Sequence, residues 1–332
     1  MLLCLQLHLA RGFHYSHHGH SSRCSSHSKH ISAVSSTTSL QSSPANMNDD
    51  EALSLELLVQ QIASNKHTKI VVVLGAGVSV SAGIPDFRTP GTGLYSKLEE
   101  YNLPYPEAIF ELGYFRMNPQ PFVEIAKAIW PGQDDGPKPT LAHAFLALLE
   151  QRGLLRRVYT QNIDGLERLA GVSDDKLIEC HGHFSTCSCI NAGCPNYKPN
   201  KIDPRQCQEA YSTGTAMQCP NCNSLVKPDI VFFGEELPSI FVDTIYQDMD
   251  DCDLLIVMGT SLLVAPVASI PNWVGRTVPR LLINRDIVGA FLKRSDKRNV
   301  IAQGDCDEGV RKICKLAGKD WIEQLEEIHG SC

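Results

Sequence analysis

Apolar residues recur along this chain with helical spacing in some segments and as short continuous runs in others. A helix is predicted near the start of the folded part, where the apolar positions are Leu53, Leu57, Leu58 and Ile62. Its candidate N-caps are Asn48, Asp49 and Asp50. A second helix is predicted between a candidate N-cap at Thr140 and a candidate C-cap at Gly153. Helical spacing returns at residues 307–316 and 319–328.

Short apolar runs lie between these helical segments, at residues 69–74, 157–160, 253–258 and 279–283. Continuous runs of this length, bounded by turn residues, are typical of strands that are buried on both faces. Strands that alternate with helices predict βαβ units and a mainly parallel sheet. The fold class is therefore expected to be α/β, with a Rossmann-like parallel sheet.

One stretch interrupts this alternation. The segment at about residues 180–225 is rich in Cys, Pro, Asn and Gly, and it is expected to form a small inserted module. The folded domain is expected to span residues 49–330, with Rossmann-like parts at about 49–180 and 226–320.

The first 48 residues have a different composition from the rest. They contain no Asp or Glu, are rich in Ser and hold seven of the twelve histidines. Such a segment buries too little apolar surface to offset its ordering entropy, which predicts a disordered tail. Its acid-free, Ser-rich, basic character is typical of a mitochondrial transit peptide, with an untargeted tail as the alternative. The mitochondrial matrix is the expected location, and the cytoplasm or nucleus is the alternative.

Charge and hydropathy exclude other classes of partner. The formal net charge of −7 does not favour direct nucleic-acid binding. No apolar run approaches the roughly 20 residues that span a bilayer, so no membrane partner is expected. Thirteen cysteines could suggest a disulfide scaffold, but a chain of 332 residues is far too large to need one. Four cysteines with metal-ligand spacing and many unpaired thiols favour a reducing compartment.

Glycines follow the first predicted strand. Gly75, Ala76 and Gly77 could bring backbone N–H groups close to a pyrophosphate. The spacing to Gly83 departs from the dehydrogenase fingerprint, which disfavours a standard dehydrogenase.

A long loop comes next, at residues 83–95, and it contains Ile84, Asp86, Phe87 and Arg88. Its Pro and Gly content predicts a functional loop, in which Arg88 could clamp a phosphate. The alternative is a surface turn with a structural Asp86–Arg88 pair.

Polar side chains also follow the strand at 157–160. Gln161, Asn162 and Asp164 are expected at the carboxyl edge of the sheet, where ligands bind in this fold class. They could hydrogen-bond ribose hydroxyls and a carboxamide, or they could simply cap the strand end.

A histidine follows another short strand pattern at 177–179. The neutral imidazole of His181 suits removal of a hydroxyl proton near neutral pH. Chemistry alone leaves a structural role, zinc ligation and the neighbouring His183 open as alternatives.

Two cysteine pairs have the spacing of metal ligands: Cys189 with Cys194, and Cys219 with Cys222. Four thiolates would hold one Zn²⁺ tetrahedrally with no open position, which makes the site structural. Cys187 could replace Cys189, and Cys207 is a further spare thiol. Cys189 is preferred because two ligands separated by one residue rarely fit one tetrahedron.

Taken together, these motifs resemble the sirtuin family of NAD-dependent protein deacylases, class I, with features of both its mitochondrial and its cytosolic branches. The resemblance covers residues of about 55–320. The matching runs are 75–79, 83–88, 159–165, 181–182, 226–235, 259–261 and 283–286.

The resemblance implies a role for each matching residue. His181 would be the general base. Contacts to NAD would come from Gly75, Ala76, Gly77, Ile84, Asp86, Phe87, Arg88, Gln161, Asn162, Asp164, Gly259, Thr260, Ser261, Asn284, Arg285 and Cys306. The substrate backbone would pair with residues 231–237, through Val231, Phe233, Gly234, Glu235 and Leu237.

The implied reaction is NAD-dependent deacetylation of protein lysine, on histone or non-histone substrates. Nicotinamide leaves, His181 removes a ribose hydroxyl proton, and the products are free lysine and O-acetyl-ADP-ribose. Zinc takes no part in the chemistry. Two alternatives are an ADP-ribosyltransferase and a non-catalytic sensor of NAD or ADP-ribose.

Overall fold

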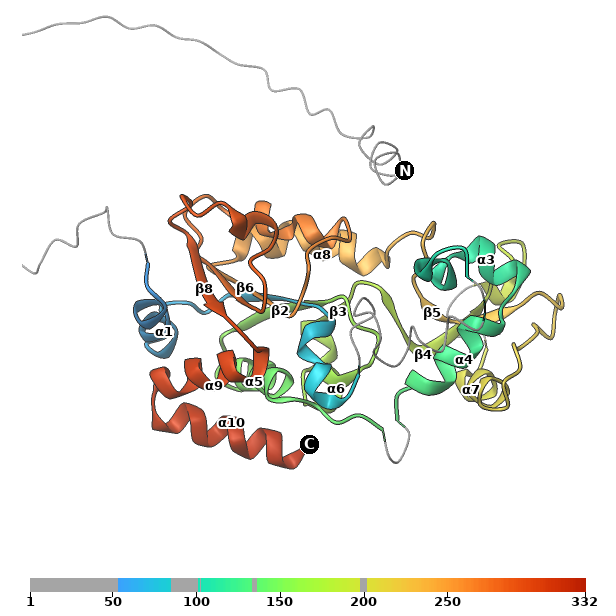
Figure 1. Cartoon of the computed structure of the whole chain (residues 1–332), viewed down its shortest axis with the longest axis horizontal. Coiled ribbons are helices and arrows are strands. Elements are labelled where there is room, and N and C mark those ends of the chain that lie inside the picture. The colour runs from blue at the N-terminus through green and yellow to red at the C-terminus, as the bar shows by residue number, and fades with distance from the viewer. Residues whose placement is uncertain (1–52, 85–100, 102, 133–135, 198–201) are drawn as a thin grey trace, which may run out of the picture. The chain divides into compact units, whose positions relative to one another are not determined.

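The structure is a computed structural model that describes residues 53–84, 101, 103–132, 136–197 and 202–332 (Figure 1). The expected tail of residues 1–48 and part of the loop after Gly83 lie outside the described residues. Among the described helices, none is long and apolar enough to cross a membrane.

A six-stranded sheet forms the centre of the larger part, and every pairing in it is parallel. Its order is β3 (Leu177–Glu179), β2 (Leu155–Thr160), β1 (Ile70–Leu74), β6 (Leu254–Met258), β7 (Arg280–Asn284) and β8 (Asn299–Gln303). The chain adds strands on one side of β1 and then on the other, so the strand order reverses between β1 and β6. The expected α/β class and parallel sheet are confirmed.

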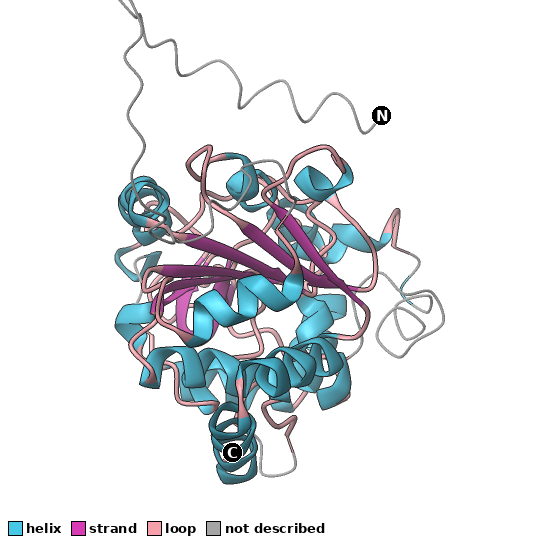
Figure 2. Cartoon of the chain, turned by 90° about the vertical axis from the view of Figure 1, so that its left-hand side faces the viewer, coloured by secondary structure: helices cyan, strands magenta, loops and turns pink. Residues whose placement is uncertain are grey.

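Each face of the sheet is covered, as Figure 2 shows. Val72 and Leu74 of β1 join one core cluster, whereas Val71 and Val73 join another, because side chains alternate across a strand. The helices of the first cluster are α1 (Leu55–Ala63), α5 (Leu141–Gln151), α9 (Cys306–Ala317) and α10 (Lys319–Ser331). The second cluster contains α8 (Ser239–Asp251), η7 (Val267–Asn272) and η8 (Gly289–Leu292).

Two details of these elements differ from the sequence-based expectation. The N-cap of α1 is Ser54, whose Oγ accepts a hydrogen bond from the N–H of Leu57 at 3.2 Å, rather than a residue of 48–50. Strand β8 is not among the predicted strands, because Val300 alone is fully buried in it and an edge strand of this kind shows no continuous apolar run. Thr140 caps α5 as expected.

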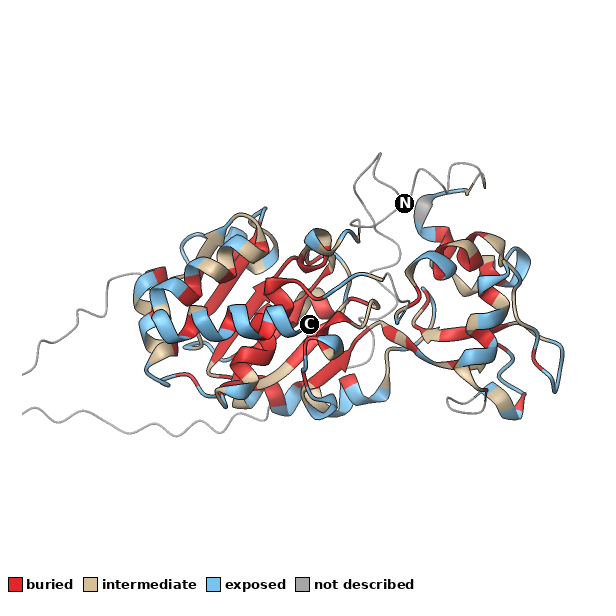
Figure 3. Ribbon diagram, turned by 90° about the horizontal axis from the view of Figure 1, so that it is seen from below, coloured by how far each residue is buried: buried red, intermediate tan, exposed pale blue. Residues whose placement is uncertain are grey.

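A smaller part of the fold is built around an antiparallel pair of strands, β4 (Gly182–Cys189) and β5 (Val226–Ile230). Its helical elements are η4 (Pro106–Phe110), α3 (Leu112–Met117), α4 (Gln120–Ile129), η6 (Pro195–Tyr197) and α7 (Pro204–Ser212). Its core contains Phe115, Phe122 and Phe232, whose rings meet edge to face. The cysteine-rich segment therefore shares its core with residues of 101–130, which were expected to belong to the sheet domain. Figure 3 shows the buried positions in red, around the six-stranded sheet and in the smaller part of the fold.

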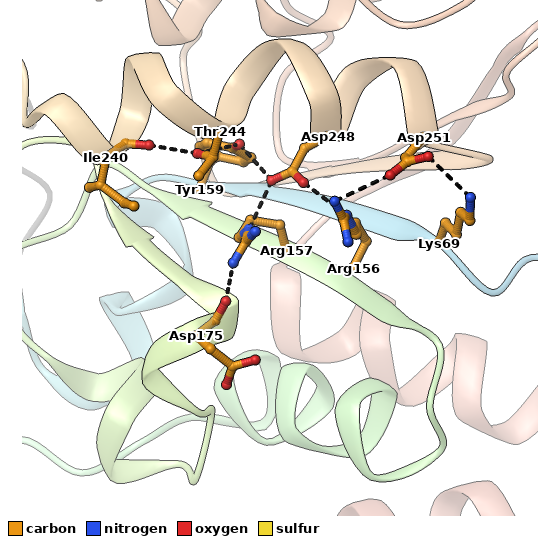
Figure 4. Close-up of polar contacts among 9 residues, drawn as sticks. All are labelled: Lys69, Arg156, Arg157, Tyr159, Asp175, Ile240, Thr244, Asp248 and Asp251. Carbon is orange, nitrogen blue, oxygen red and sulfur yellow. Dashed lines mark hydrogen bonds and ion pairs between the residues drawn. The ribbon is translucent and has the colours of Figure 1, made fainter.

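One buried carboxylate attaches α8 to the sheet (Figure 4). Asp248 accepts hydrogen bonds of 2.8 Å from Arg156 Nε, Arg157 Nε and the hydroxyl of Tyr159, all on β2. Its side chain is 1% exposed, and the two guanidinium groups offset the cost of burying its charge. Because α8 follows residues 231–237 in the chain, this network holds the downstream end of that segment.

Candidate active site and zinc site

The loops after β1 and β6 pack directly against each other where the strand order reverses. Gly77 N donates to Gly259 O at 2.8 Å, and Gly75 N donates to Met258 O at 3.1 Å. A Cβ on Gly77 would lie 2.7 Å from Gly259 Cα, and Gly259 itself has φ +60°. Only glycine permits this close crossing. It lies at the topological switch point of the sheet, where ligands bind in open α/β folds.

The first part of the glycine-rich loop, residues 75–84, contains two short 3-10 helices. Ala76 begins η1 (Ala76–Val78) and is half-buried, and Gly83 has φ +83°. Ile84 follows it and is also half-buried. Three residues expected to contact NAD lie outside the described residues: Asp86, Phe87 and Arg88.

Amide side chains after β2 connect that strand to both glycine loops. Gln161 Nε2 donates to Leu74 O at 3.0 Å and to Thr260 Oγ1 at 2.9 Å. Asn162 is buried, and its Nδ2 donates to Gly75 O at 3.3 Å and to Ser79 Oγ at 3.4 Å. Gln161 and Asn162 thus lie beside the glycine loop, at the carboxyl end of β2.

Asp164 lies in the same cluster. Its carboxylate accepts hydrogen bonds from Ser79 Oγ at 2.7 Å and from Leu166 N at 3.1 Å. Burial raises the pKa of Asp164, and these two hydrogen bonds oppose the shift. Asp164 therefore also contacts the first residue of α6 (Leu166–Leu169), beyond the strand end that it was expected to cap.

His181 follows β3 and contacts the end of β2. Its Nδ1 lies 3.0 Å from the backbone carbonyl oxygen of Gln161, so Nδ1–H donates and Nε2 keeps its lone pair. Burial lowers the pKa of His181, although the Gln161 carbonyl opposes the shift. The neighbouring His183 lies on β4, and its buried Nδ1 has no hydrogen-bond partner among the described residues. The structure thus brings His181, rather than His183, to the polar strand end.

Gly182 is required between these two histidines. Its φ is +75°, and a Cβ there would lie 1.9 Å from the carbonyl oxygen of Asp229 on β5. The backbone therefore turns at Gly182 from β3 into β4, and this turn determines the position of His181.

The loops after β6 and β7 are linked by Asn284, whose Nδ2 donates to Thr260 O at 3.1 Å and to Asp286 O at 2.8 Å. Arg285 is exposed and lies 3.7 Å from Asp305. Cys306 begins α9, and its thiol lies 3.6 Å from Ile283 O. Ser261 is exposed beside Thr260. These residues, expected from the resemblance to hold the adenosine half of NAD, thus share one edge of the sheet with the glycine loops.

The segment expected to bind the substrate runs between the two parts of the fold. Val231 N donates to His181 O at 2.8 Å, and Phe233 N donates to Phe110 O at 2.7 Å. The side chain of Phe233 is 48% exposed, and Gly234 has φ +94°. Phe233 is thus placed on the surface two residues from the contact with His181.

Two side chains of this segment are engaged within the protein. The carboxylate of Glu235 accepts from Phe232 N at 2.8 Å and pairs with the buried ammonium of Lys227 at 3.0 Å. Leu237 packs against the core that contains Phe241. The side chains of Glu235 and Leu237 are therefore both engaged within the protein.

The four expected cysteine ligands meet in space. Their sulfur atoms lie within 4.8 Å of one another, with Cys189 and Cys222 at 3.5 Å and Cys194 and Cys219 at 3.7 Å. A tetrahedral Zn²⁺ with bonds of about 2.3 Å places its sulfur ligands about 3.8 Å apart, so the residues fit this ion. Cys187 is not in the group.

Cys187 instead contacts the other spare thiol, Cys207 of α7, by a hydrogen bond. Both side chains are fully buried in the core of the smaller part. They therefore act as packing residues of that core, and the choice of Cys189 over Cys187 as a member of the metal-binding group is confirmed.

Two buried polar residues beneath this site were not singled out from the sequence. Glu167 is 1% exposed and accepts from Thr160 Oγ1 at 2.5 Å, and burial together with Asp164 raises its pKa to about 8. His143 is fully buried in α5, where burial lowers its pKa to about 4. The sequence signal for His143 was a lone histidine within the apolar run of α5.

The fold and site define a dinucleotide-binding α/β protein with a four-thiolate module. The chain belongs to the Sir2 family, whose model matches residues 75–266. It is 45% identical over 305 residues to NAD-dependent protein deacetylase sirtuin-2 of Danio rerio, covering 87% of this chain and 78% of that protein. It is 43% identical over 281 residues to sirtuin-3 of Mus musculus, covering 85% and 80%. It is 44% identical over 288 residues to hst2 of Schizosaccharomyces pombe, covering 84% and 80%.

Proposed function

We propose that this chain is an NAD-dependent protein-lysine deacetylase in which His181 is the general base. The relatives named above are all NAD-dependent protein deacetylases, which supports the reaction class. The observation that carries the assignment of His181 is its hydrogen bond to Gln161 O, because it leaves Nε2 as a proton acceptor beside the polar strand end.

Bound NAD would supply an activated glycosidic bond and, after nicotinamide departs, an electrophilic ribose carbon. The residues proposed to hold it are Gly75, Ala76, Gly77, Ile84, Asp86, Phe87, Arg88, Gln161, Asn162, Asp164, Gly259, Thr260, Ser261, Asn284, Arg285 and Cys306. The close crossing of Gly77 and Gly259 supports this, since it exposes backbone next to the polar side chains of β2. The negative charge of Asp164 would favour the cationic nicotinamide ring.

The task of His181 is to take a proton from a ribose hydroxyl. Its lowered pKa keeps the ring neutral at neutral pH, so the base form is the resting form. When Nε2 gains the proton, the Gln161 carbonyl that accepts from Nδ1–H stabilises the resulting cation.

An acetylated protein segment would bind along residues 231–237. The N–H groups of Val231, Phe232, Phe233 and Glu235 are used within the protein, so a peptide would pair with the remaining backbone groups of this segment as an added strand. The exposed ring of Phe233 would flank the acyl-lysine. Histone and non-histone proteins both fit this mode, because backbone pairing is independent of sequence.

One zinc ion would be held by Cys189, Cys194, Cys219 and Cys222. With four thiolates it has no open coordination position, so its role is to stabilise the smaller part of the fold.

The deciding experiment is nicotinamide release from NAD with and without an acetylated peptide. Release should depend on the peptide in the wild type. His181→Ala should stop the formation of free lysine, because His181 acts after nicotinamide departs, while the matched variant His183→Ala keeps activity. Peptide-independent release with ADP-ribose appearing on protein would favour the transferase alternative. NAD binding without any release would favour the sensor alternative.

The proposed location is the mitochondrial matrix, on the basis of the acid-free, Ser-rich composition of residues 1–48. Relatives named sirtuin-2 and sirtuin-3 match to a similar degree, so the cytoplasm or nucleus is the alternative. The N-terminus of the endogenous protein distinguishes them, since matrix import predicts removal of the first residues and an intact Met1 contradicts it.

A further inference from the structure

Three ionisable side chains meet next to Asn162, and two of them, His143 and Glu167, are buried while Asp164 is partly buried. A ring nitrogen of His143 and one carboxylate oxygen each of Asp164 and Glu167 lie within 4.8 Å of one another. They come from three places in the fold: α5, the loop after β2 and α6. Glu167 is 1% exposed and His143 is fully buried.

A metal ion is the first explanation that this set of residue types suggests, but the tautomer of His143 argues against it. Thr140 engages Nδ1 twice: its backbone N–H donates to Nδ1 at 3.2 Å and its Oγ1 lies 2.8 Å away, and the backbone donor favours the tautomer with the proton on Nε2. Nε2 is buried with no partner among the described residues. An N–H at this position is a hydrogen-bond donor to carboxylates and has no lone pair for an ion.

Ionisation of both carboxyl groups is unfavourable, because they lie within 4.8 Å of each other and Glu167 is buried. Like charges at this separation repel strongly, and burial adds a desolvation cost to each. One proton between them resolves the conflict. Asp164 accepts two hydrogen bonds, from Ser79 and Leu166, which favours its ionised form, whereas Glu167 accepts one, from Thr160. The proton therefore belongs on Glu167.

Both carboxyl groups are connected to Asn162. On one side, Thr160 Oγ1 accepts from Asn162 N at 3.1 Å and donates to Glu167. On the other side, Ser79 Oγ accepts from Asn162 Nδ2 and donates to Asp164. A second negative charge on Glu167 would strengthen the hydrogen bond from Thr160 but repel the carboxylate of Asp164, and so disturb the connection to Asn162 through Ser79.

We propose that Asp164 and Glu167 share a single proton, held by Glu167 beside the N–H of His143, and that Glu167 is thereby a positioning residue for the nicotinamide end of the site. This inference rests on the proposed function, because Asn162 and Asp164 are assigned to that end of NAD. The shared proton leaves one negative charge under a cationic ring and keeps Asn162 in place.

Other ionisable groups lie near Glu167 and bear on how activity depends on pH. Glu179 of β3 adds negative charge and is paired with Arg168 of α6 at 2.9 Å, and the thiol of Cys180 is buried nearby. His143 stays neutral because burial lowers its pKa. Glu167 is thus the member of this group expected to lose a proton as pH rises above neutral, since its own pKa is raised by burial and by Asp164.

The test compares Glu167→Gln with the wild type. An amide has the shape of the protonated acid, donates toward Asp164 and cannot ionise. We expect kcat/KM for NAD within about threefold of wild type at neutral pH, and loss of the alkaline decline that the wild type shows. Glu179→Gln is the matched control, because it changes a neighbouring buried carboxylate outside the shared-proton pair. It should keep an alkaline decline, shifted to lower pH because the charge of Glu179 helps to raise the pKa of Glu167.

Two results would overturn the proposal. One is a Glu167→Gln pH profile that superposes on that of the wild type; the other is a loss of more than about tenfold for this variant at neutral pH. Glu167→Ala should raise KM for NAD at least about tenfold and leave KM for the peptide unchanged. If that variant does not fold, the Glu167→Gln profile alone decides.

A second measurement separates this proposal from the proposed function. The folded state keeps a proton on Glu167 that the unfolded chain releases, so wild-type stability should fall with pH between the ordinary and the raised pKa of Glu167. Glu167→Gln should flatten this dependence in thermal unfolding. Equal slopes refute the shared proton whether or not the enzyme is active, whereas an inactive wild type with the expected slopes refutes only the function.

Discussion

Nδ1 of His181 lies 3.0 Å from the backbone carbonyl oxygen of Gln161, and this contact joins the ends of β3 and β2. Because the acceptor is a backbone atom, no side-chain substitution at position 161 removes it. The ring is therefore held with Nε2 available, in the tautomer that a base requires.

The first prediction concerns the acid side of the pH profile. Burial lowers the pKa of His181 below its ordinary value of 6.5, so the base form persists until the pH falls below that value. We expect the acidic decline of kcat/KM to lie below pH 6.5, and His181→Ala to reduce deacetylation at least about 100-fold at neutral pH.

Rates across pH with a fixed acetylated peptide check this prediction. His183→Ala serves as the control, since His183 lies on β4 and has no contact with Gln161 among the described contacts. An acidic decline centred above pH 6.5 would contradict the assigned cause of the shift.

The second prediction concerns Cys187 and Cys189, which are two residues apart and both buried. Wild-type protein should hold one zinc ion per chain. Cys189→Ser should lose it and lower the unfolding temperature, because a missing thiolate opens the tetrahedral site. Cys187→Ser should keep the zinc, because its thiol contacts Cys207 instead. Metal analysis of the purified variants checks this, and equal zinc loss in both would refute the ligand set.

How much of this structure can be predicted from the sequence depends on how far apart in the chain the contacting residues are. The strands β1 and β6 were predictable because each is a local apolar run that is buried on both faces. The four cysteines were predictable because metal ligands have characteristic spacing. The packing of Phe115 and Phe122 against Phe232 was not, since nothing local in residues 112–129 indicates contact with a segment more than a hundred residues away.

The same distinction holds within the site. His181 could be chosen over His183 only from the order of motifs, and the structure supplies the physical reason in the Gln161 carbonyl. The engagement of Glu235 with Lys227 is not predictable in this way, because an acidic residue in a substrate-binding motif suggests a peptide contact. Local sequence does not show which way such a side chain points.

The third prediction concerns Gly182. Alanine there meets both a left-handed backbone and the Asp229 carbonyl oxygen, at 1.9 Å from the new Cβ. We expect a loss of about 2–5 kcal/mol in the free energy of unfolding, together with displacement of His181 and loss of activity.

Gly153→Ala is the matched control for that substitution. Gly153 has φ +70°, and a Cβ there would meet no atom within 4 Å, so this variant carries the backbone cost alone, about 1–2 kcal/mol. Chemical denaturation of both variants measures the difference. Equal losses would show that the contact with Asp229 has no energetic consequence.

The last prediction concerns the ion pair behind the proposed substrate segment. The Lys227 ammonium is buried, donates to Ile230 O at 2.6 Å, pairs with Glu235 at 3.0 Å and lies over the Phe232 ring. Lys227→Met keeps the aliphatic stem but leaves Glu235 without its partner. We expect a loss of about 3 kcal/mol in stability. We also expect a higher KM for the acetylated peptide with little change in KM for NAD, because Glu235 holds Phe232 N and thereby the path of Phe233.

Lys319→Met is the control for charge removal as such. Lys319 pairs with Glu323 at 3.3 Å on the exposed surface of α10, where water and salt screen the interaction, so no measurable change is expected. Steady-state kinetics with each substrate varied in turn give the two KM values. If Lys227→Met raises both KM values equally, the ion pair stabilises the fold in general and has no specific role in substrate binding. If the ion pair shapes residues 231–237, only the KM for the peptide should rise.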